Sequence, residues 1–543
     1  MILPTFCGRF IGYTLHMSRA MVASAEPLAS HVGVDVMRRG GNAVDAAVAV
    51  GFALAVTYPQ AGNLGGGGFL LWRRKDGKTA AIDYREMAPG AAFRDVYAGK
   101  TEEGGPTVGW RASGTPGTVA GLALAHKKYG SGRLSFAALI EPARALAGDG
   151  FIAPASLTRS LTSDKALLSR YEATKAIFID VTEGQRFRQP ELAETLARIQ
   201  KNGPREFYEG ETAKRIAAAM RPHGWINERD LRGYEVKERR VVAGRYRGHG
   251  IVSMPPPSSG GAVLIEILNI LEGFELAKMG WESSLRWHLL VEAMKRAFAD
   301  RAEFFGDPDF VTVPVGKLTD PAYAARWRAG IDLRHTTPSA AIRAGQASAE
   351  PLHTTHFSII DSDGNAVSNT YTLNGSHGSG VTIPGTGILM NNEMDDFAAN
   401  PGKPNRYGLI QGESNAVKAR KRPLSSMSPT FVTYPNGTLR LIIGSPGGPT
   451  IINTVLHVIL NVIDHGQPIA EAIAVPRVHH QWLPDEIGAD RGLSPEIQVG
   501  LERLGHVFGK PRSLGDAQGI LITPDGTVTG TSDPRGSGQV AAD

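Results

Sequence analysis

The sequence contains a single cysteine, Cys7, among its 543 residues. One cysteine excludes a disulfide framework and any cysteine-based metal or cluster site. Long apolar runs are missing too, because no window reaches the roughly 18 uninterrupted apolar residues of a transmembrane helix. The most apolar stretch, residues 46–56, is shorter and predicts a buried core helix. Residues 1–16 lack a basic n-region and a clear small-residue cleavage site, so we expect the segment 1–19 to be a poor or truncated signal peptide.

A strong excess of one charge is also absent. Lys and Arg total 58 against 53 Asp and Glu, which gives a formal net charge of +5. A nucleic-acid binder needs basic residues gathered on one face. The tightest cluster, Lys418, Arg420, Lys421 and Arg422, is explained equally well by a solvated loop. We therefore expect no nucleic-acid partner.

Glycine is abundant, with 65 residues beside 34 prolines, but the two together stay below the roughly 25–30% that marks low-complexity chains. Hydrophobic residues make up 42% of the chain and charged residues 20%. A chain of this length and composition can bury a sizeable core. Disorder, collagen and coiled coil are excluded as descriptions of the whole chain.

Helical spacing of apolar residues dominates the first part of the chain. Residues 30–57 predict two helices separated by Gly40–Gly41, with Asn42 as the N-cap of the second. Four glycines at 65–68 precede an apolar strand, and they indicate backbone packed against backbone or a turn that no side chain would fit. Further helices are predicted at 188–201, 208–220, 262–273 and 284–303. Residues 328–352 are polar without apolar periodicity and predict an exposed, loosely held connector.

Strands become frequent after this connector. Residues 354–361 and 366–374 flank the turn Asp363-Gly364-Asn365 and predict a hairpin. Further strands are predicted at 386–392, 430–434 and 438–443, followed by an amphipathic helix at 449–465. Strands and helices therefore occur in both halves of the chain, and we find no internal repeat.

A glycine turn between a strand and a helix is the first candidate for chemistry. In the stretch 442–450, Gly444-Ser445-Pro446-Gly447-Gly448 joins an apolar strand to a helix start. Free backbone N–H groups at such a junction can bind an anion. The lysine of a phosphate-binding loop is missing, whereas an oxyanion hole needs no lysine. A simple packing turn explains the stretch equally well.

Two histidine pairs could suggest zinc. The pair His353 and His356 has no Glu in the position that a HExxH motif requires, and it falls in a strand pattern. His479 and His480 are adjacent, and neighbours on a strand point to opposite faces. We therefore expect no metal site.

Charged residues supply two further candidates. The stretch 391–397 places Glu393, Asp395 and Asp396 just after an apolar strand. Such carboxylates can hold an ammonium, act as acid and base, bind calcium, or form an exposed acidic turn. Arg85 can clamp a carboxylate with two hydrogen bonds, or it can pair with Glu86 or Asp83 on the surface.

Taken together, a cationic fork, a carboxylate cluster and an anion-stabilising turn suit a zwitterionic amino-acid head beside an acyl-transfer centre. A nucleophile with its base is missing from this set. The GxSxG elbow that presents a nucleophilic serine does not occur in the sequence. Composition and spacing alone lead no further.

The chain resembles bacterial γ-glutamyltransferases from about residue 20 to 540. Twelve segments carry the resemblance in the family's order: GGNAVDAAVAVGFALAVTYPQAGNLGGGGF, DYREMAP, ASGTPGTVAG, SMPPPSSGG, TTHFSI, DGNAV, YTLN, NNEMDDF, KRPLSSMSPT, GSPGG, HHQWLP and SDPR. The resemblance implies an α+β fold, the four-layer αββα core of N-terminal nucleophile hydrolases. It also implies a precursor that cuts itself between His353 and Thr354. The products are a large subunit, 20–353, and a small subunit, 354–543, that stay together as a heterodimer.

The resemblance also assigns catalytic roles. Thr354, once N-terminal, is the nucleophile, and its α-amine, with a reference pKa of about 7.7–8.0, is the base. This amine supplies the base that the motif search does not find. Thr372 in YTLN corresponds to the residue that orients the nucleophile. Gly447 and Gly448 correspond to the donors of the oxyanion hole.

Substrate-binding roles follow in the same way. Arg85 is expected to grip the α-carboxylate of the glutamyl group with help from Ser425 and Ser426. Asn374, Glu393 and Asp396 are expected to hold its α-ammonium. Tyr407 corresponds to the aromatic residue of a lid loop. The chain departs from some bacterial members at Glu393, where they carry Gln, and at His353 before the cut.

The implied activity is transfer of the γ-glutamyl group of glutathione and related compounds to water, or to amino-acid and dipeptide acceptors, without a cofactor. Family resemblance implies a periplasmic or secreted enzyme, while the weak signal keeps the cytoplasm open. Two alternatives remain. One is a glutaryl-type cephalosporin acylase of the same superfamily, and the other is an uncleaved, non-catalytic scaffold.

Overall fold

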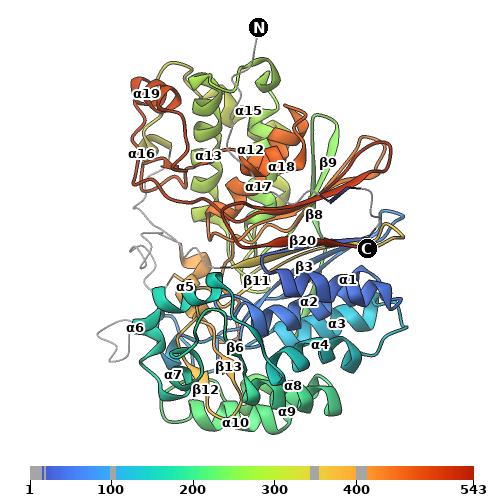
Figure 1. The fold of residues 1–543 in the computed structure, drawn as a ribbon. Coiled ribbons are helices and arrows are strands. Elements are labelled where there is room, and N and C mark those ends of the chain that lie inside the picture. Colours follow the sequence, from blue (N-terminus) through green and yellow to red (C-terminus); the bar gives the residue numbers. More distant parts are fainter. Residues whose placement is uncertain (1–14, 17–19, 98–104, 343–353, 399–411) are drawn as a thin grey trace.

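Two seven-stranded sheets lie face to face in the middle of the molecule, and helices cover both outer faces (Figure 1). The computed structural model describes residues 15–16, 20–97, 105–342, 354–398 and 412–543. The α+β fold with four αββα layers, predicted from the resemblance, is confirmed.

Every pairing within the two sheets is antiparallel in the described residues. The first sheet has the order β1 (Leu15–His16), β19 (Val528–Ser532), β18 (Gln518–Ile522), β15 (Leu439–Gly444), β14 (Thr430–Thr433), β9 (His249–Ser253) and β8 (Val242–Tyr246). The second sheet has the order β20 (Gln539–Ala542), β2 (Met21–Ser24), β10 (Thr355–Ile360), β11 (Ala366–Thr372), β3 (Gly67–Arg73), β4 (Thr79–Tyr84) and β7 (Lys237–Arg239).

In the described residues, three two-stranded sheets lie outside these two large sheets. They pair β5 (Phe151–Ile152) with β6 (Arg186–Phe187), β12 (Thr382–Ile383) with β13 (Ile388–Leu389), and β16 (Val478–His479) with β17 (Gly488–Ala489). Single-turn 3₁₀ helices include η1 (Trp110–Ala112), η2 (Leu276–Lys278), η3 (Glu393–Asp396) and η4 (Glu413–Asn415).

One helical layer covers the second sheet, and α2 is its most buried helix. Helices on this side of the molecule are α1 (Pro27–Arg38), α2 (Ala43–Thr57), α3 (Thr118–Tyr129), α4 (Phe136–Gly148), α5 (Ala155–Ser163), α6 (Lys165–Leu168), α7 (Glu172–Phe178), α8 (Pro190–Asn202), α9 (Arg205–Glu209), α10 (Glu211–Met220) and α11 (Glu228–Arg232). The other layer covers the first sheet with α12 (Gly260–Leu271), α13 (Ser284–Phe304), α14 (Val315–Leu318), α15 (Pro321–Ala329), α16 (Ser339–Ile342), α17 (Thr450–Ile463), α18 (Ile469–Ala474) and α19 (Pro495–Arg503).

Apolar residues fill the three spaces between the four layers. One core lies between helices α1–α11 and the second sheet, and another lies between the first sheet and helices α12–α19. The third lies between the sheets, where Phe69 of β3 belongs to the same cluster as Phe431 of β14 and Ile442 of β15. Because both faces of the central strands are covered, strands such as β10 and β11 are buried at every position.

Local signals placed the first helices correctly. Asn42 caps α2, and its side chain accepts hydrogen bonds from Val44 N and Asp45 N at 3.0 Å each. The glycine run packs backbone against backbone, as predicted. A Cβ at Gly66 would lie 2.1 Å from the Thr372 carbonyl oxygen, and one at Gly68 would lie 2.4 Å from that of Thr370.

Two predictions of local structure hold only in part. The strand predicted at 386–392 is limited to β13, because Gly385 and Gly387 turn the chain with φ of 70° and 65°. The basic cluster is a solvated loop only in part. Lys421 is buried and donates to the carbonyls of Ser414 (2.7 Å) and Ala416 (3.0 Å), and Arg422 is buried as well.

In its described part, the connector predicted at 328–352 is mostly exposed, as expected, but it is not loosely held. The Ser339 side chain is fully buried, and its hydroxyl donates to the Trp482 carbonyl at 2.5 Å. The Thr337 N–H donates to Glu292 at 3.1 Å. Buried polar partners hold this segment, so apolar periodicity could not reveal it. Residues 343–353 lie outside the described part.

Within the described residues, no helix combines the length and the hydropathy that crossing a membrane requires.

Candidate active site

A narrow cavity of about 20 Å³ lies where the second sheet meets the glycine turn. Eight of the residues that the sequence singled out line it: Arg85, Thr354, Thr372, Asn374, Asp396, Ser425, Ser426 and Gly448. Met427 and Ile451 complete the lining. Gly447 is adjacent in the chain, and Glu393 lies behind Arg85. His353 and Tyr407 fall outside the described residues.

The β10–β11 hairpin brings Thr354 to the cavity. Thr355 pairs with Tyr371, so the antiparallel register places Thr354 beside Thr372. The Thr354 side chain is 8% exposed, directly before the first residue of a buried strand. A residue in this position is held by the sheet but reachable from the cavity.

The end of β11 turns sharply at Asn374. This residue has φ of 77°, a left-handed conformation that costs a non-glycine residue free energy and is often found at functional sites. Its N–H donates to the Thr372 hydroxyl oxygen at 2.8 Å, and its side-chain amide donates to the Asn392 carbonyl at 3.0 Å. The turn thus ties the hydroxyl of Thr372 to the acidic turn η3.

The Arg85 guanidinium is fully buried at the floor of the cavity, so the surface-pair alternative is wrong. Its Nη1 lies 2.8 Å from Glu393 Oε1, and its Nη2 contacts Asp396 and the Leu424 carbonyl. Glu86 Oε2 lies 3.7 Å from the same guanidinium. The acidic turn is therefore also buried, with Asp396 reaching the cavity at 14% exposure.

Burial shifts the pKa values of two carboxyl groups beside Arg85. It raises the pKa of Glu86 to about 8 and the pKa of Glu393 well above its usual value, although Arg85 opposes both shifts. The carboxylates raise the pKa of Arg85, so the guanidinium stays charged. Near neutral pH the cluster therefore retains a proton among its buried carboxyls. Asp396, at the cavity, is the carboxylate that a ligand can reach.

The two serines are held by residues that sequence analysis missed. Ser259 donates to the Ser425 carbonyl from both its N–H and its hydroxyl, at 2.8 Å each. Arg301, buried on α13, donates to the Ser259 hydroxyl oxygen and to the Ser426 hydroxyl oxygen, at 2.9 Å each. The SMPPPSSGG segment contained Ser259, but only the fold brings Arg301 to it. These contacts hold the Ser425 backbone and the Ser426 hydroxyl, and both residues line the cavity.

The glycine turn leads from β15 into α17. Gly447 has φ of 133° and Gly448 has φ of 56°, conformations that favour glycine. Among the described residues, neither of their N–H groups has a hydrogen-bond acceptor. Two unpaired N–H groups beside a cavity at a helix N-terminus are suited to an oxyanion.

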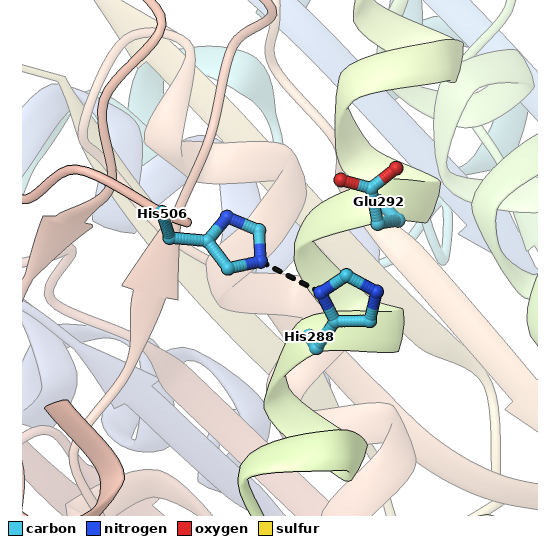
Figure 2. A group of neighbouring side chains, drawn as sticks. All are labelled: His288, Glu292 and His506. Carbon is cyan, nitrogen blue, oxygen red and sulfur yellow. Dashed lines mark hydrogen bonds between the residues drawn. The ribbon is translucent and has the colours of Figure 1, made fainter. Parts of the chain in front are cut away.

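A possible metal-ligand group lies elsewhere, between α13 and the chain that follows α19. It consists of His288, Glu292 and His506 (Figure 2). His288 Nδ1 and His506 Nε2 are 2.8 Å apart, whereas two nitrogens on one tetrahedral zinc would be about 3.3 Å apart. Glu292 is already engaged by Arg296 at 2.6 Å and Lys295 at 3.5 Å. The arrangement fits hydrogen-bonded neutral imidazoles, and burial lowers the pKa of both.

Comparison with known proteins gives a consistent result. The family model for gamma-glutamyltranspeptidase matches residues 29–543. A glutathione hydrolase proenzyme of Escherichia coli K12 is 49% identical, covering 96% of this chain and 91% of that protein. The structure of a cephalosporin acylase from Bacillus halodurans matches with a TM-score of 0.87 at 28% identity, covering 100% and 99% of the two chains. A Helicobacter pylori gamma-glutamyltranspeptidase chain is 42% identical with a TM-score of 0.57, covering 59% of this chain and 94% of that one.

Proposed function

Because the chain belongs to the γ-glutamyltranspeptidase family, we propose that it is a self-processing γ-glutamyltransferase acting on glutathione and related γ-glutamyl compounds. One observation carries this proposal. Thr354, Thr372, Arg85, Asp396 and Gly448 come from distant parts of the chain and line one cavity. These residues supply a nucleophile, groups for both charges of an amino-acid head, and an oxyanion donor.

Maturation is a cut between His353 and Thr354 that leaves a large subunit, 20–353, and a small subunit, 354–543. The sheet pairing supports lasting association of the two. Strand β10 of the small subunit lies between β2 of the large subunit and β11 of its own chain. In the same sheet β11 pairs with β3, so the two chains alternate. Separation would break backbone hydrogen bonds along buried strands.

In the proposed reaction the free α-amine of Thr354 takes the hydroxyl proton as Oγ attacks the γ-carbonyl carbon. Thr372 orients that hydroxyl, and the N–H groups of Gly447 and Gly448 stabilise the tetrahedral oxyanion. Collapse breaks the C–N bond, and the leaving amine takes the proton from the Thr354 ammonium. The γ-glutamyl ester of Thr354 then passes its acyl group to water or to an amino-acid or dipeptide acceptor.

The glutamyl head is bound by exchange of ion-pair partners. Its α-carboxylate binds Arg85 with help from Ser425 and Ser426, and its α-ammonium binds Asp396 with Asn374 and Glu393. In the structure Arg85 already contacts Glu393 and Asp396, so the head enters between existing opposite charges. This costs less than burying a lone charge. Tyr407 covers the bound group in this proposal.

The acylase alternative draws on the high structural similarity to the cephalosporin acylase. A glutaryl group has no α-ammonium, however, and the buried carboxylates beside Arg85 leave Asp396 facing the space where an ammonium would sit. Comparing turnover of γ-glutamyl and glutaryl anilides separates the two functions. We expect the γ-glutamyl anilide to be preferred by at least tenfold, since a charge-assisted hydrogen bond contributes roughly 1.5–3 kcal/mol. Equal or faster turnover of the glutaryl anilide would favour the acylase.

Intact mass tests the maturation step. The wild-type protein should give fragments of about 38 and 20 kDa, in proportion to the 57.9 kDa chain, and Thr354→Ala should remain whole. Turnover of γ-glutamyl anilide should accompany the cut. A wild-type chain that stays uncut would support the non-catalytic scaffold instead. By the same family membership we place the enzyme in the periplasm or outside the cell, which fractionation of producing cells tests.

A further inference from the structure

Two buried hydroxyl groups flank the glycine turn, and each donates to a carbonyl within it. Ser445 Oγ donates to the Pro446 carbonyl oxygen at 2.8 Å. Thr450 Oγ1 donates to the Gly447 carbonyl oxygen at 2.7 Å. The Ser445 side chain is fully buried and that of Thr450 is 1% exposed. These are the carbonyls of two successive peptide groups.

The same two peptide groups carry the N–H groups assigned to the oxyanion hole. Both peptide bonds are trans, and in a trans peptide the carbonyl and the following N–H point in opposite directions. Fixing the Pro446 carbonyl therefore fixes the direction of the Gly447 N–H. Fixing the Gly447 carbonyl in the same way directs the Gly448 N–H away from Thr450 and α17. Gly448 itself lines the cavity.

The turn needs such restraint because it contains two consecutive glycines. Glycine samples both signs of φ readily, so a Gly-Gly peptide rotates at little cost. The Gly447 carbonyl also accepts from Thr450 N at 3.1 Å, and the Ser445 hydroxyl oxygen accepts from Asp516 N at 3.0 Å. Thr450 thus links the Gly447 carbonyl to α17, and Ser445 links the Pro446 carbonyl to the loop before β18.

We propose that Ser445 and Thr450 are positioning residues, which hold the two peptide groups of the turn so that both N–H groups point at the developing oxyanion. This inference rests on the proposed function. The hydroxyls touch neither substrate nor nucleophile, and they act through the carbonyls of Pro446 and Gly447. Pre-oriented donors stabilise the charge that develops in the transition state, which differs from binding of the glutamyl head. Losing a hydroxyl should therefore lower kcat and leave KM largely unchanged.

The test compares Ser445→Ala, Thr450→Val and the double variant with the wild-type enzyme on a γ-glutamyl anilide. Rates are expressed per cleaved enzyme, measured by intact mass. We expect each single variant to lose roughly fivefold to tenfold in kcat, the size of one net hydrogen bond, with KM and inhibition by L-glutamate within about twofold of wild type. The double variant should lose roughly 25- to 100-fold, because each hydroxyl holds its own peptide group.

Two controls separate positioning from stability. Thr450→Ser restores the hydroxyl and should recover kcat to within about twofold of wild type. Thr195→Val removes another buried hydroxyl, on α8 and away from the residues lining the cavity. This hydroxyl donates to the Thr386 carbonyl at 2.8 Å. It should lower Tm without lowering kcat. If Thr450→Val does not fold, Thr450→Ala takes its place in the same comparison.

Three results would overturn the inference: unchanged kcat in both single variants, Thr450→Ser as slow as Thr450→Val, or a kcat loss in Thr195→Val equal to theirs. Each would mean that the hydroxyls serve general packing only. A wild-type enzyme that cleaves itself but does not turn over γ-glutamyl anilide would instead overturn the proposed function, and the inference with it. An active wild type with unaffected variants overturns the inference alone.

Discussion

At the scale of single residues, the acidic cluster divides into buried members and one accessible member. Glu86 and Glu393 are fully buried, whereas Asp396 lines the cavity. Burial raises the pKa of the first two, and neither side chain lines the cavity. In the proposed function, Asp396 is therefore the main partner of the α-ammonium, and Arg85, which contacts it, is the partner of the α-carboxylate.

Asp396→Asn is expected to lower kcat/KM for γ-glutamyl anilide by roughly 10- to 100-fold, the size of a lost charge-assisted hydrogen bond. The amide keeps the shape of the side chain and removes its charge. Turnover of a glutaryl anilide, which has no ammonium, should change by less than about threefold. Asp35→Asn is a matched control, since that side chain is 66% exposed on α1. Equal losses on both substrates would contradict the role given to Asp396.

At the scale of elements, much could be predicted because the signals are local. Asn42 and the apolar run after it defined α2, and the turn at Asp363-Gly364-Asn365 defined the β10–β11 hairpin. The part that failed depends on distant partners. The sequence around Ser339 contains no signal that Trp482 will contact and bury it.

The candidate site follows the same division. The glycine turn and the acidic turn were visible as patterns, but a purely structural explanation was as good for the first and better for the second. Arg85 and Asp396 are 311 residues apart, so only the fold, or a family resemblance, could join them. Arg301 was missed because a buried arginine on a helix gives no periodic signal. Its place at the site is known only from its hydrogen bonds to Ser259 and Ser426 in the structure.

Strand β3 provides a test of backbone packing. Gly68→Ala would place a Cβ 2.4 Å from the Thr370 carbonyl oxygen and force β3 away from β11. We expect a loss of about 1–3 kcal/mol in unfolding free energy, as for other overpacked sites. Gly280→Ala is the matched control, because its Cβ would meet no atom within 4 Å. Urea unfolding of both variants checks the prediction, and similar curves for the two would refute it.

At the scale of the whole molecule, buried histidines couple stability to pH. Burial lowers the pKa of His356, His457, His479 and His506 to about 3. In the unfolded chain these groups titrate near 6.5, so the unfolded state binds more protons between about pH 6.5 and pH 3. Stability should therefore fall as the pH is lowered through this range.

His506→Asn should weaken this dependence, because it removes one of the groups that the unfolded state protonates. His335→Asn is the control, since that side chain is 75% exposed. Tm measured from pH 7.5 to pH 5 should fall less for His506→Asn than for His335→Asn and the wild type. Parallel curves for all three proteins would mean that the buried histidines do not control acid stability.

Because strands of the two subunits alternate in the second sheet, refolding of the cleaved enzyme differs from folding of the precursor. Before the cut, β2, β10 and β11 belong to one covalent chain, and folding is a first-order process at any dilution. After the cut the same sheet can form only when two separate chains meet. Refolding of denatured mature enzyme should therefore lose yield on dilution, whereas the uncut Thr354→Ala chain should refold equally well at all concentrations. The covalent connection thus makes folding of the precursor independent of concentration, an advantage that the mature enzyme no longer has.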